Sequence, residues 1–273
     1  MNLLIIGGGN MGGAIVRALL EDSKRIFSSI FVCDANREKR EMFLRLGVKT
    51  ILELDFAVCA TCDVILVAVK PQDFSGVLSV LQNFLGAEKP KLILSIAAGI
   101  PISFIRSYLP SVHIIRIMPN TPAMIQQGIS AWTAGREVTS HEKKIAQKLL
   151  RTLGDEVYIE NEGQMDAVTA LSGCGPAYVY LFLQSLILGG DKLGLSKEIS
   201  AKLAMQTVLG ATLLAEKSPA DLDTLIKNVA SKGGTTEAAL SHFEKKRVSQ
   251  NIQEAMKKAF LRGREFGRKF KKT

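Results

Sequence analysis

The sequence has few of the side chains from which metal sites and disulfide frameworks are built. Its three histidines are far apart, so no metal cluster is predicted. Of the four cysteines only Cys59 and Cys62 lie close together, without a second pair or a nearby histidine, which favours two buried thiols over a zinc site or a redox motif. Scattered cysteines of this kind fit a cytoplasmic location with reduced thiols.

The chain also shows no signal-peptide pattern and no unbroken apolar run typical of a membrane helix. Residues 3–6 are already strand-like, without a basic region or a cleavage site before them. The most apolar stretch, residues 167–190, is interrupted by the sequence SGCGP at 172–176 and contains Gln184. A helix apolar on most sides in a water-soluble protein must be covered, so this stretch predicts an obligate dimer and no membrane span.

Acidic residues are in deficit, 26 against 35 lysines and arginines, which gives a formal net charge of +9. Residues 257–273 supply +7 of that charge, so the rest of the chain is nearly neutral. A basic end to a final helix complements the helix dipole and is usually solvated. We therefore expect no nucleic-acid partner, with binding by this tail as the alternative.

Short apolar runs alternate with helical patterns in the first 160 residues. The runs at 3–6, 30–33, 64–69, 92–96 and 112–117 predict strands separated by crossover helices. This alternation is typical of an α/β fold with a Rossmann-like, doubly wound parallel sheet. Strand signals end near residues 160–163. We expect a dinucleotide-binding domain over residues 1–161 and an all-α dimerisation domain over residues 162–273.

A glycine motif, Gly7-x-Gly9-x-x-Gly12, follows the first predicted strand and precedes a helical run at residues 11–20. The first glycine permits a tight turn, the second lets the backbone approach a pyrophosphate, and the third lets helix and strand pack closely. The helix N-terminus adds N–H donors. The motif predicts a dinucleotide site, the alternative being a glycine-rich turn without a ligand.

The identity of the dinucleotide is left open by the residues after the second predicted strand. Asp34 stands where a carboxylate would accept hydrogen bonds from a ribose diol, which favours NADH. Asn36 and Arg37 follow at once, and a guanidinium there suits the 2′-phosphate of NADPH. If Asp34 only caps the next helix and does not bind a ribose, NADPH becomes the favoured cofactor.

A second glycine-rich turn, SKGGTT at residues 231–236, precedes another helical run. Free backbone N–H groups and threonine hydroxyls at a helix N-terminus suit a small carboxylate. The alternative is a capped helix start with Thr235 or Thr236 as the N-cap and no ligand.

Six blocks in this order resemble the pyrroline-5-carboxylate reductase family over essentially the whole chain. They are GGGNMG (7–12), AVKP (68–71), SIAAG (95–99), RIMPNTP (116–122), DAVTALSGCGPAY (166–178) and SKGGTT (231–236). The fifth and sixth blocks are specific to the family, whereas the first is shared with many dehydrogenases. The resemblance implies reduction of 1-pyrroline-5-carboxylate to L-proline with NADPH or NADH, the last step of proline synthesis, and no metal. It also implies helix-exchanged dimers that often form larger rings, commonly decamers.

The resemblance also implies roles for individual residues. For the cofactor it implies Gly7, Gly8, Gly9, Asn10, Met11, Gly12, Val69, Lys70, Pro71, Ala98 and Asn228, to which the residues after the second predicted strand add Asp34, Asn36 and Arg37. The substrate pocket would include Glu216, Gly233, Gly234, Thr235 and Thr236. Thr236 is the candidate for a hydrogen bond to the ring nitrogen, with Ser231 and the N–H groups of residues 233–235 holding the carboxylate.

Two features depart from the family pattern. Lys232 stands where the family usually has proline, which adds a cation beside the expected carboxylate. The segment from Pro219 to Ser231 is about three residues longer than the resemblance leads us to expect, which makes Glu216 the weakest assignment. A related imine or β-hydroxyacid reductase is the rival function, although such enzymes would place a catalytic lysine or aspartate near the first long helix. Asp166 is the only acid there, and no lysine lies between Lys148 and Lys192.

Overall fold

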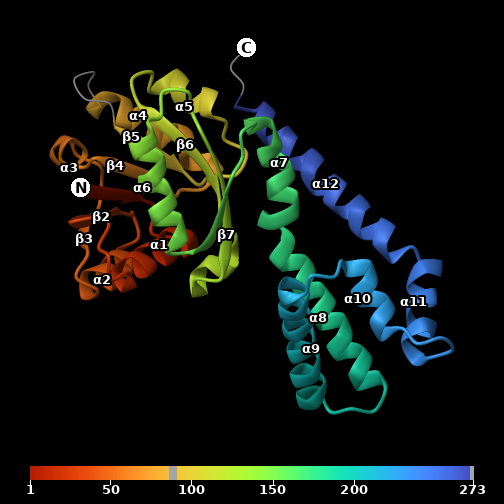
Figure 1. Ribbon diagram of the computed structural model, residues 1–273. Coiled ribbons are helices and arrows are strands. Elements are labelled where there is room, and N and C mark those ends of the chain that lie inside the picture. The colour runs from red at the N-terminus through yellow and green to blue at the C-terminus, as the bar shows by residue number, and fades with distance from the viewer. Residues whose placement is uncertain (86–90, 271–273) are drawn as a thin grey trace. The chain divides into compact units, whose positions relative to one another are not determined.

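The computed structural model describes residues 1–85 and 91–270, and its contacts divide them into two compact units (Figure 1). Unit 1 comprises Met1–Cys174 together with the C-terminal segment from Ala259, and unit 2 comprises Gly175–Lys258. The compact units divide between Cys174 and Gly175, and the expected domain boundary between residues 161 and 162 stays a prediction. Residues 162–174 and the C-terminal segment pack with unit 1. The return of the C-terminal segment to unit 1 could not be predicted, because no local sequence pattern indicates a contact between segments so far apart in the chain.

Unit 1 is an eight-stranded sheet with helices on both faces. Its elements are β1 (Asn2–Ile6), α1 (Asn10–Glu21), β2 (Ser29–Cys33), α2 (Arg37–Arg45), β3 (Lys49–Ile51), α3 (Phe56–Thr61), β4 (Val64–Val67), η1 (Pro71–Asp73), α4 (Phe74–Phe84), β5 (Leu92–Ser95), α5 (Ile102–Tyr108), β6 (His113–Met118), η2 (Thr121–Ile125), β7 (Gly128–Ala134), α6 (Ser140–Arg151), β8 (Gly154–Tyr158), η3 (Glu162–Gln164), α7 (Met165–Val168) and η4 (Thr169–Gly173). The strand order is β3-β2-β1-β4-β5-β6-β7-β8. The α/β prediction is confirmed, and the sequence missed β3, β7 and β8.

Every neighbouring pair in the sheet is parallel except β6 and β7, which run antiparallel. The sheet is therefore mostly parallel, as expected, and the one antiparallel pair involves β7, which was not predicted from the sequence. The carboxyl ends of β1, β2, β4, β5 and β6 nevertheless meet at one edge, which is where ligands bind in open α/β sheets. That edge carries the glycine motif.

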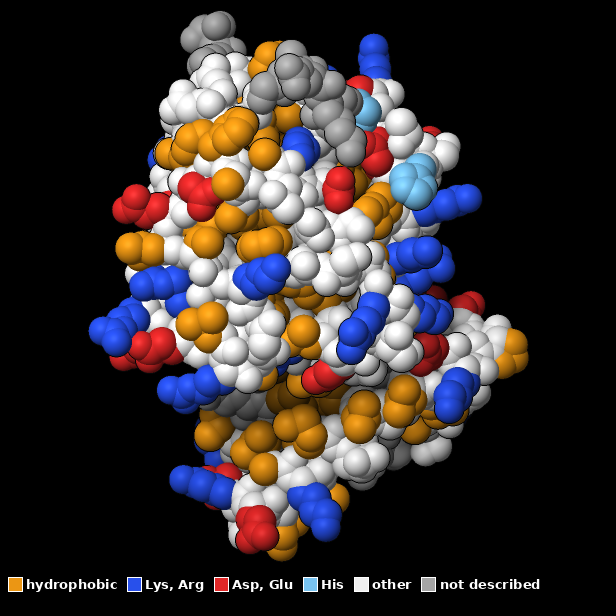
Figure 2. All heavy atoms as spheres, turned by 90° about the vertical axis from the view of Figure 1, so that its left-hand side faces the viewer, with side chains coloured by type: hydrophobic (Ala, Val, Ile, Leu, Met, Phe, Trp, Pro, Cys, Tyr) orange, Lys and Arg blue, Asp and Glu red, His pale blue; other side chains and the backbone are white. Residues whose placement is uncertain are grey.

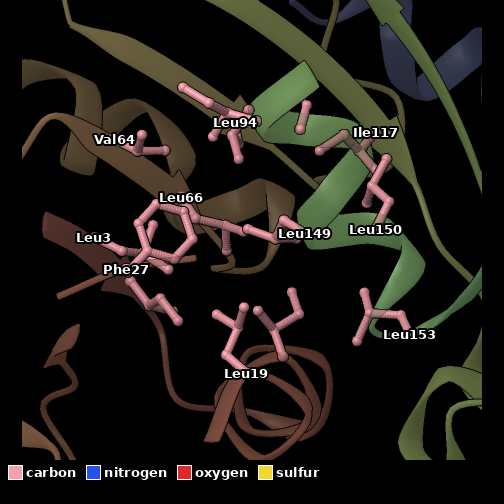
Figure 3. Close-up of a cluster of buried hydrophobic side chains, with 14 of the residues drawn as sticks. Leu3, Leu19, Phe27, Val64, Leu66, Leu94, Ile117, Leu149, Leu150 and Leu153 are labelled. Carbon is pink, nitrogen blue, oxygen red and sulfur yellow. The ribbon is translucent and has the colours of Figure 1, made fainter. Parts of the chain in front are cut away.

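The two faces of the sheet are covered by different helices because successive side chains of each strand point to opposite sides. Leu3 and Leu66 pack with apolar residues of α1 and α6 in one buried cluster (Figure 3). Leu4 and Ile65 pack with α4 and α5 in the other. The central strands are buried on both faces, as parallel strands between helical layers must be. This double core fixes the carboxyl edge as a rigid platform.

Helix α6 begins with a capping box that also binds a histidine of the sheet. The Thr139 side chain accepts the N–H of Glu142, and the Glu142 carboxylate accepts the N–H and hydroxyl of Thr139. Both carboxylate oxygens also lie 2.8–2.9 Å from His113 Nδ1 on β6. Burial raises the pKa of Glu142, but the bonds from Thr139 and His113 outweigh it, and the pKa lies below its usual value.

We expect Glu142→Gln to lower the urea midpoint of unfolding at about pH 7 but to have little effect near pH 3. A carboxyl whose pKa is lowered by folding adds stability above its unfolded pKa, and that stability is lost as the pH falls through the folded pKa. The exposed Glu160→Gln is the control, because its carboxylate has no hydrogen bond or ion pair among the described residues. A Glu142→Gln deficit of equal size at both pH values would contradict this expectation.

Unit 2 consists of helices. These are α8 (Gly175–Lys192), α9 (Lys197–Lys217), α10 (Leu222–Val229), α11 (Thr235–Lys245) and the first half of α12 (Val248–Arg268). Helices α8 and α9 form a hairpin whose close approach places Gly190 against Ser200. Only Leu183 of α8 is buried, although the helix is strongly apolar. Large apolar side chains are consequently exposed along both helices, and orange apolar surface gathers in the lower part of Figure 2.

The helical stretch Glu162–Lys192 is, within the described residues, the one that is long and apolar enough to cross a membrane by length and composition. Only 6% of its most apolar window is buried in the single chain. A π-helical turn at Thr169–Gly173 interrupts it, close to the break predicted from the sequence. An apolar helix this exposed needs a cover from outside the chain.

Candidate cofactor and substrate sites

The first glycine turn is held tightly against the ends of two neighbouring strands. Gly7 has φ +101°, and its N–H donates to the carbonyl oxygen of Cys33 at 2.8 Å. A Cβ atom at Gly7 would lie 2.8 Å from the carbonyl oxygen of Ala68. A Cβ at Gly12 would overlap the carbonyl oxygen of Gly7. Both positions therefore require glycine, as the motif predicts.

Gly9 differs from its neighbours because a Cβ there would meet no protein atom within 4 Å. Gly9 is the N-cap of α1 but offers no side chain to the free N–H groups of the first turn. No acidic residue lies in that turn. A bare, positively polarised helix end with open space before it fits a pyrophosphate.

Asp34 connects this turn to the end of β2. Its Oδ2 accepts the N–H of Gly8 at 2.7 Å and its Oδ1 accepts the N–H of Asn36 at 2.8 Å. Lys39 Nζ lies 3.6 Å from Oδ2. The N-cap of α2 is Asn36, whose side chain accepts the N–H of Lys39, so the alternative in which Asp34 caps the helix is wrong. Asp34 therefore shapes the glycine turn. A contact between Asp34 and the ribose of a cofactor stays a prediction.

The remaining predicted cofactor residues of unit 1 lie along the same edge. Asn10 and Met11 begin α1, whereas Val69, Lys70 and Pro71 follow β4 and Ala98 follows β5. Arg37 begins α2 with its side chain 84% exposed and paired only with Glu41. The structure therefore gathers thirteen of the fourteen predicted residues of this site at one edge of the sheet. The fourteenth, Asn228, lies in unit 2, and its role stays a prediction.

The second glycine turn joins α10 to α11 within unit 2. The N-cap of α11 is Gly234, without a side-chain hydrogen bond, so the alternative in which Thr235 or Thr236 caps the helix is wrong. Gly233 has φ +73°, and a Cβ at Gly234 would lie 2.5 Å from Ser231 Oγ. The described residues include no hydrogen-bond partner for either threonine hydroxyl. These hydroxyls are free to bind a ligand.

A carboxylate of the protein itself occupies part of this turn. The N–H of Gly233 donates to Glu237 Oε2 at 2.6 Å, and the N–H of Gly234 donates to the carbonyl oxygen of Ser231 at 2.9 Å. Of the three N–H groups expected to hold the substrate carboxylate, that of Thr235 alone is unbonded within the described chain. The prediction that Gly233 and Gly234 present free donors is therefore wrong, because the glutamate in the first turn of α11 reaches back to the loop.

Asn228 and Glu216 lie on the helices that lead to this turn. Asn228 is exposed near the end of α10, three residues before Ser231. Glu216 is exposed at the end of α9, with the loop to α10 between it and the turn. The roles of both stay predictions, as does the influence of Lys232, whose side chain is exposed.

Sequence reasoning used the block at 166–178 to identify a family but gave none of its residues a role in the site. The structure places the π-helical turn of this block against the end of β6, where a Cβ at Gly173 would overlap Met118 Cε. Asn120 Nδ2 donates to Ser172 Oγ at 3.4 Å, and Asn120 Oδ1 accepts the N–H of Ile129. Such turns are frequent at functional sites, but the sequence carries no signal for the extra residue in the helix.

Cys59 and Cys62 are both free thiols buried in the core of unit 1. Burial raises the pKa of Cys59 to about 12 and that of Cys62 to about 11, so both thiols stay protonated. No group of metal-ligating side chains occurs in the part of the chain that the structure describes. This agrees with the prediction of two buried thiols.

Comparison with known proteins finds one family model that matches the N-terminal part of the chain and another that matches the C-terminal part. Residues 162–266 match the family model for pyrroline-5-carboxylate reductase dimerisation, and residues 2–99 match that for NADP oxidoreductase, coenzyme F420-dependent. The pyrroline-5-carboxylate reductase of Haemophilus influenzae is 38% identical over 96% of each chain, and that of Pseudomonas aeruginosa is 35% identical over 96% of each. The crystal structure of the Plasmodium falciparum pyrroline carboxylate reductase with NADP bound has a TM-score of 0.87 at 30% identity, covering 98% of each chain. The chain belongs to the pyrroline-5-carboxylate reductase family.

Proposed function

We propose that this protein reduces 1-pyrroline-5-carboxylate to L-proline with NAD(P)H, as the final step of proline biosynthesis. The observation that carries the proposal is the 38% identity to a pyrroline-5-carboxylate reductase over nearly the full length of both chains. The open pyrophosphate cradle at Gly9 and the free threonine hydroxyls at the second turn support it. Addition of 1-pyrroline-5-carboxylate to the protein and NADPH should cause loss of nicotinamide absorbance, and an inert protein would contradict the proposal.

The chain itself has to hold and align the two reactants. When bound, the reduced nicotinamide supplies the hydride that the imine carbon accepts. The turn from Gly7 to Gly12 holds the pyrophosphate, and Val69 to Pro71 with Ala98 line the rest of the cofactor site. A protonated cyclic imine is already electrophilic, so alignment is the main contribution of the protein. The same measurement with NADH in place of NADPH decides the cofactor preference.

The substrate side belongs to the second glycine turn. In this proposal the hydroxyl of Thr236 forms a hydrogen bond to the ring nitrogen, and Ser231 and the N–H of Thr235 bind the carboxylate. Glu237 holds the N–H of Gly233, so the substrate carboxylate either uses the other donors or displaces this side chain. The proton that the ring nitrogen gains comes from solvent water, since a threonine hydroxyl is too weak an acid to supply it.

Replacing Thr236 by alanine should lower kcat about tenfold, the value of one lost hydrogen bond that is stronger in the transition state. The dissociation constant for NADPH should not change, because Thr236 belongs to the substrate side. Thr61→Ala on α3 is the matched control, since the hydroxyl of this exposed threonine donates to the carbonyl oxygen of Ala57 in its own helix. Unaltered steady-state kinetics in Thr236→Ala would remove this residue from the site.

We further propose that the functional unit is a cytoplasmic homodimer in which α8 and α9 are covered by the partner. The match to a dimerisation model and the exposed apolar faces of both helices support this. Assembly of dimers into a ring such as a decamer is the larger form suggested by the resemblance. Lysine and arginine side chains are dispersed among other types on the one face shown in Figure 2. Our proposal includes no nucleic-acid or membrane partner.

A further inference from the structure

The C-terminal part of α12 returns to unit 1 and contacts the loop after β5. A Cβ atom at Gly267 would lie 3.3 Å from the carbonyl oxygen of Gly99, closer than ordinary contact. Gly99 has φ +77°, and a Cβ there would lie 3.4 Å from Phe266 Cβ and 3.6 Å from the backbone nitrogen of Gly267. The two backbones thus approach each other through glycines on both sides. The residue that precedes this contact is Ala98, which is assigned to the cofactor site.

An aromatic contact fixes the same chain end to the next helix. The rings of Phe270 and Phe104 on α5 lie 5.0 Å apart in an edge-to-face arrangement, and Phe104 in turn contacts Tyr108 at 5.3 Å. Phe104 is buried in the core on that face of the sheet. Phe104 is anchored in the core, so its contact with Phe270 fixes the position of the C-terminal segment beside the loop between β5 and α5.

The far end of the loop is held by ion pairs around the buried Arg116. Glu162 Oε1 accepts the N–H of Ile102, the first residue of α5, at 2.8 Å, and also lies 3.2 Å from Arg116 Nη1. Arg116 is 8% exposed and also pairs with Asp166 at 3.5 Å. Glu162 thus fixes the end of the loop between β5 and α5. The turn at Gly99 in the same loop is instead contacted by Phe266 and Gly267 of α12.

The contact between α12 and the loop is narrow. A cavity of about 520 Å³ lies beside it, lined in part by Ser103, Arg264 and Arg268. One turn earlier on α12, a Cβ at Gly263 would lie 3.9 Å from the nearest atoms, those of Asp166, which is ordinary contact. Of these two glycines of α12, Gly267 is the one at which an added Cβ would crowd the loop backbone, so a side chain there would press on that backbone.

We propose that the C-terminal end of α12 positions the Ala98–Gly99 turn for the cofactor, with Gly267 and Phe270 as positioning residues. The inference rests on the proposed function through the assignment of Ala98 to the cofactor site. A side chain at Gly267 pushes the carbonyl of Gly99 and displaces the adjacent Ala98. The cofactor then binds more weakly, whereas the substrate turn in unit 2 is not altered.

The test is the dissociation constant for NADPH, measured by nicotinamide fluorescence without the imine. Gly267→Ala should weaken binding about threefold and Gly267→Val about tenfold, as expected for overpacking at a tight contact. Gly263→Ala is the matched control, with the same substitution on the same helix, and should bind as the wild type does. Both alanine variants also raise helix propensity, so a loss of helix cannot explain weaker binding in one of them. In turnover assays the KM for NADPH should rise, while kcat and the KM for the imine stay within about twofold.

Phe270→Ala provides a second variant without added volume and should also weaken NADPH binding, even if Gly267→Val does not fold. Equal affinity in the wild type, Gly267→Ala and Phe270→Ala would overturn the inference, as would an equal loss in Gly263→Ala and Gly267→Ala. A wild-type protein that binds neither NADPH nor NADH would instead contradict the proposed function. The two failures are thereby distinguishable.

Discussion

Replacement of Gly12 by alanine is expected to abolish dinucleotide binding and to lower the free energy of unfolding by about 3 kcal/mol. A Cβ at this position would overlap the carbonyl oxygen of Gly7, a backbone atom that cannot rotate away. The overlap forces α1 away from β1 and opens the turn before it. The higher helix propensity of alanine, about 1 kcal/mol, offsets only part of this cost. Urea unfolding and NADPH fluorescence titration measure the two effects.

Gly9→Ala is the matched variant that separates cofactor binding from folding. A Cβ there meets no protein atom, and the backbone angles of φ −69° and ψ −168° suit alanine, so stability should fall by no more than about 1 kcal/mol, the typical cost of alanine at an N-cap. NADPH affinity should still fall about a hundredfold, because the methyl group takes the space of the pyrophosphate. Wild-type affinity in Gly9→Ala would show that no pyrophosphate lies against this turn.

Leu181→Glu on α8 is expected to convert the oligomer into inactive monomers. Leu181 is 64% exposed in the single chain, and it belongs to a helix of which only Leu183 is buried. Burying a carboxylate in each copy of an apolar interface costs several kcal/mol per charge, which exceeds what a typical interface can absorb. Analytical ultracentrifugation at assay concentration, together with NADPH oxidation, measures both consequences.

Lys192→Glu at the end of the same helix is the control, since it changes charge where the helix is already polar. It should sediment as the wild type does and retain activity. An active, monomeric Leu181→Glu protein would contradict the role assigned to the exposed face of α8. A wild-type chain that is itself a stable, active monomer would contradict the dimer outright.

β4 shows why a strand that is buried on both faces can be predicted from the sequence. Val64–Val67 is fully buried between two helical layers, so its sequence is a continuous apolar run that stands out from its surroundings. β8 was missed because Asp155 and Glu156 interrupt it. In the fold, Glu156 accepts the indole N–H of Trp132 at 2.7 Å and pairs with Arg151, which makes a carboxylate tolerable in a strand. Such partners are distant in sequence and leave no local pattern.

Some features of the candidate site could likewise be predicted from the sequence, and others could not. Gly7 could be predicted because its φ of +101° favours glycine, and Gly12 because a Cβ there would overlap the carbonyl oxygen of Gly7, a neighbour only five residues away. The partners of Asp34 could not be predicted, because Gly8 lies 26 residues away and meets this carboxylate only where β1 and β2 pair. The bond between Gly233 and Glu237 was also missed, although it is local, because a side chain that reaches back to a loop depends on the angle at which the helix starts.

The sequence by itself determined where the chain turns on glycine and where apolar runs must be covered, because backbone sterics and hydrophobic burial act over a few neighbouring residues. It thereby determined an α/β unit with a dinucleotide turn and a helical part with an uncovered apolar face. Only the tertiary structure decided which donors are already bonded, that β7 runs antiparallel to β6, and that residues 259–270 return to unit 1 beside the loop that follows β5. These features depend on contacts between distant segments, whose energies exist only once the whole chain is packed.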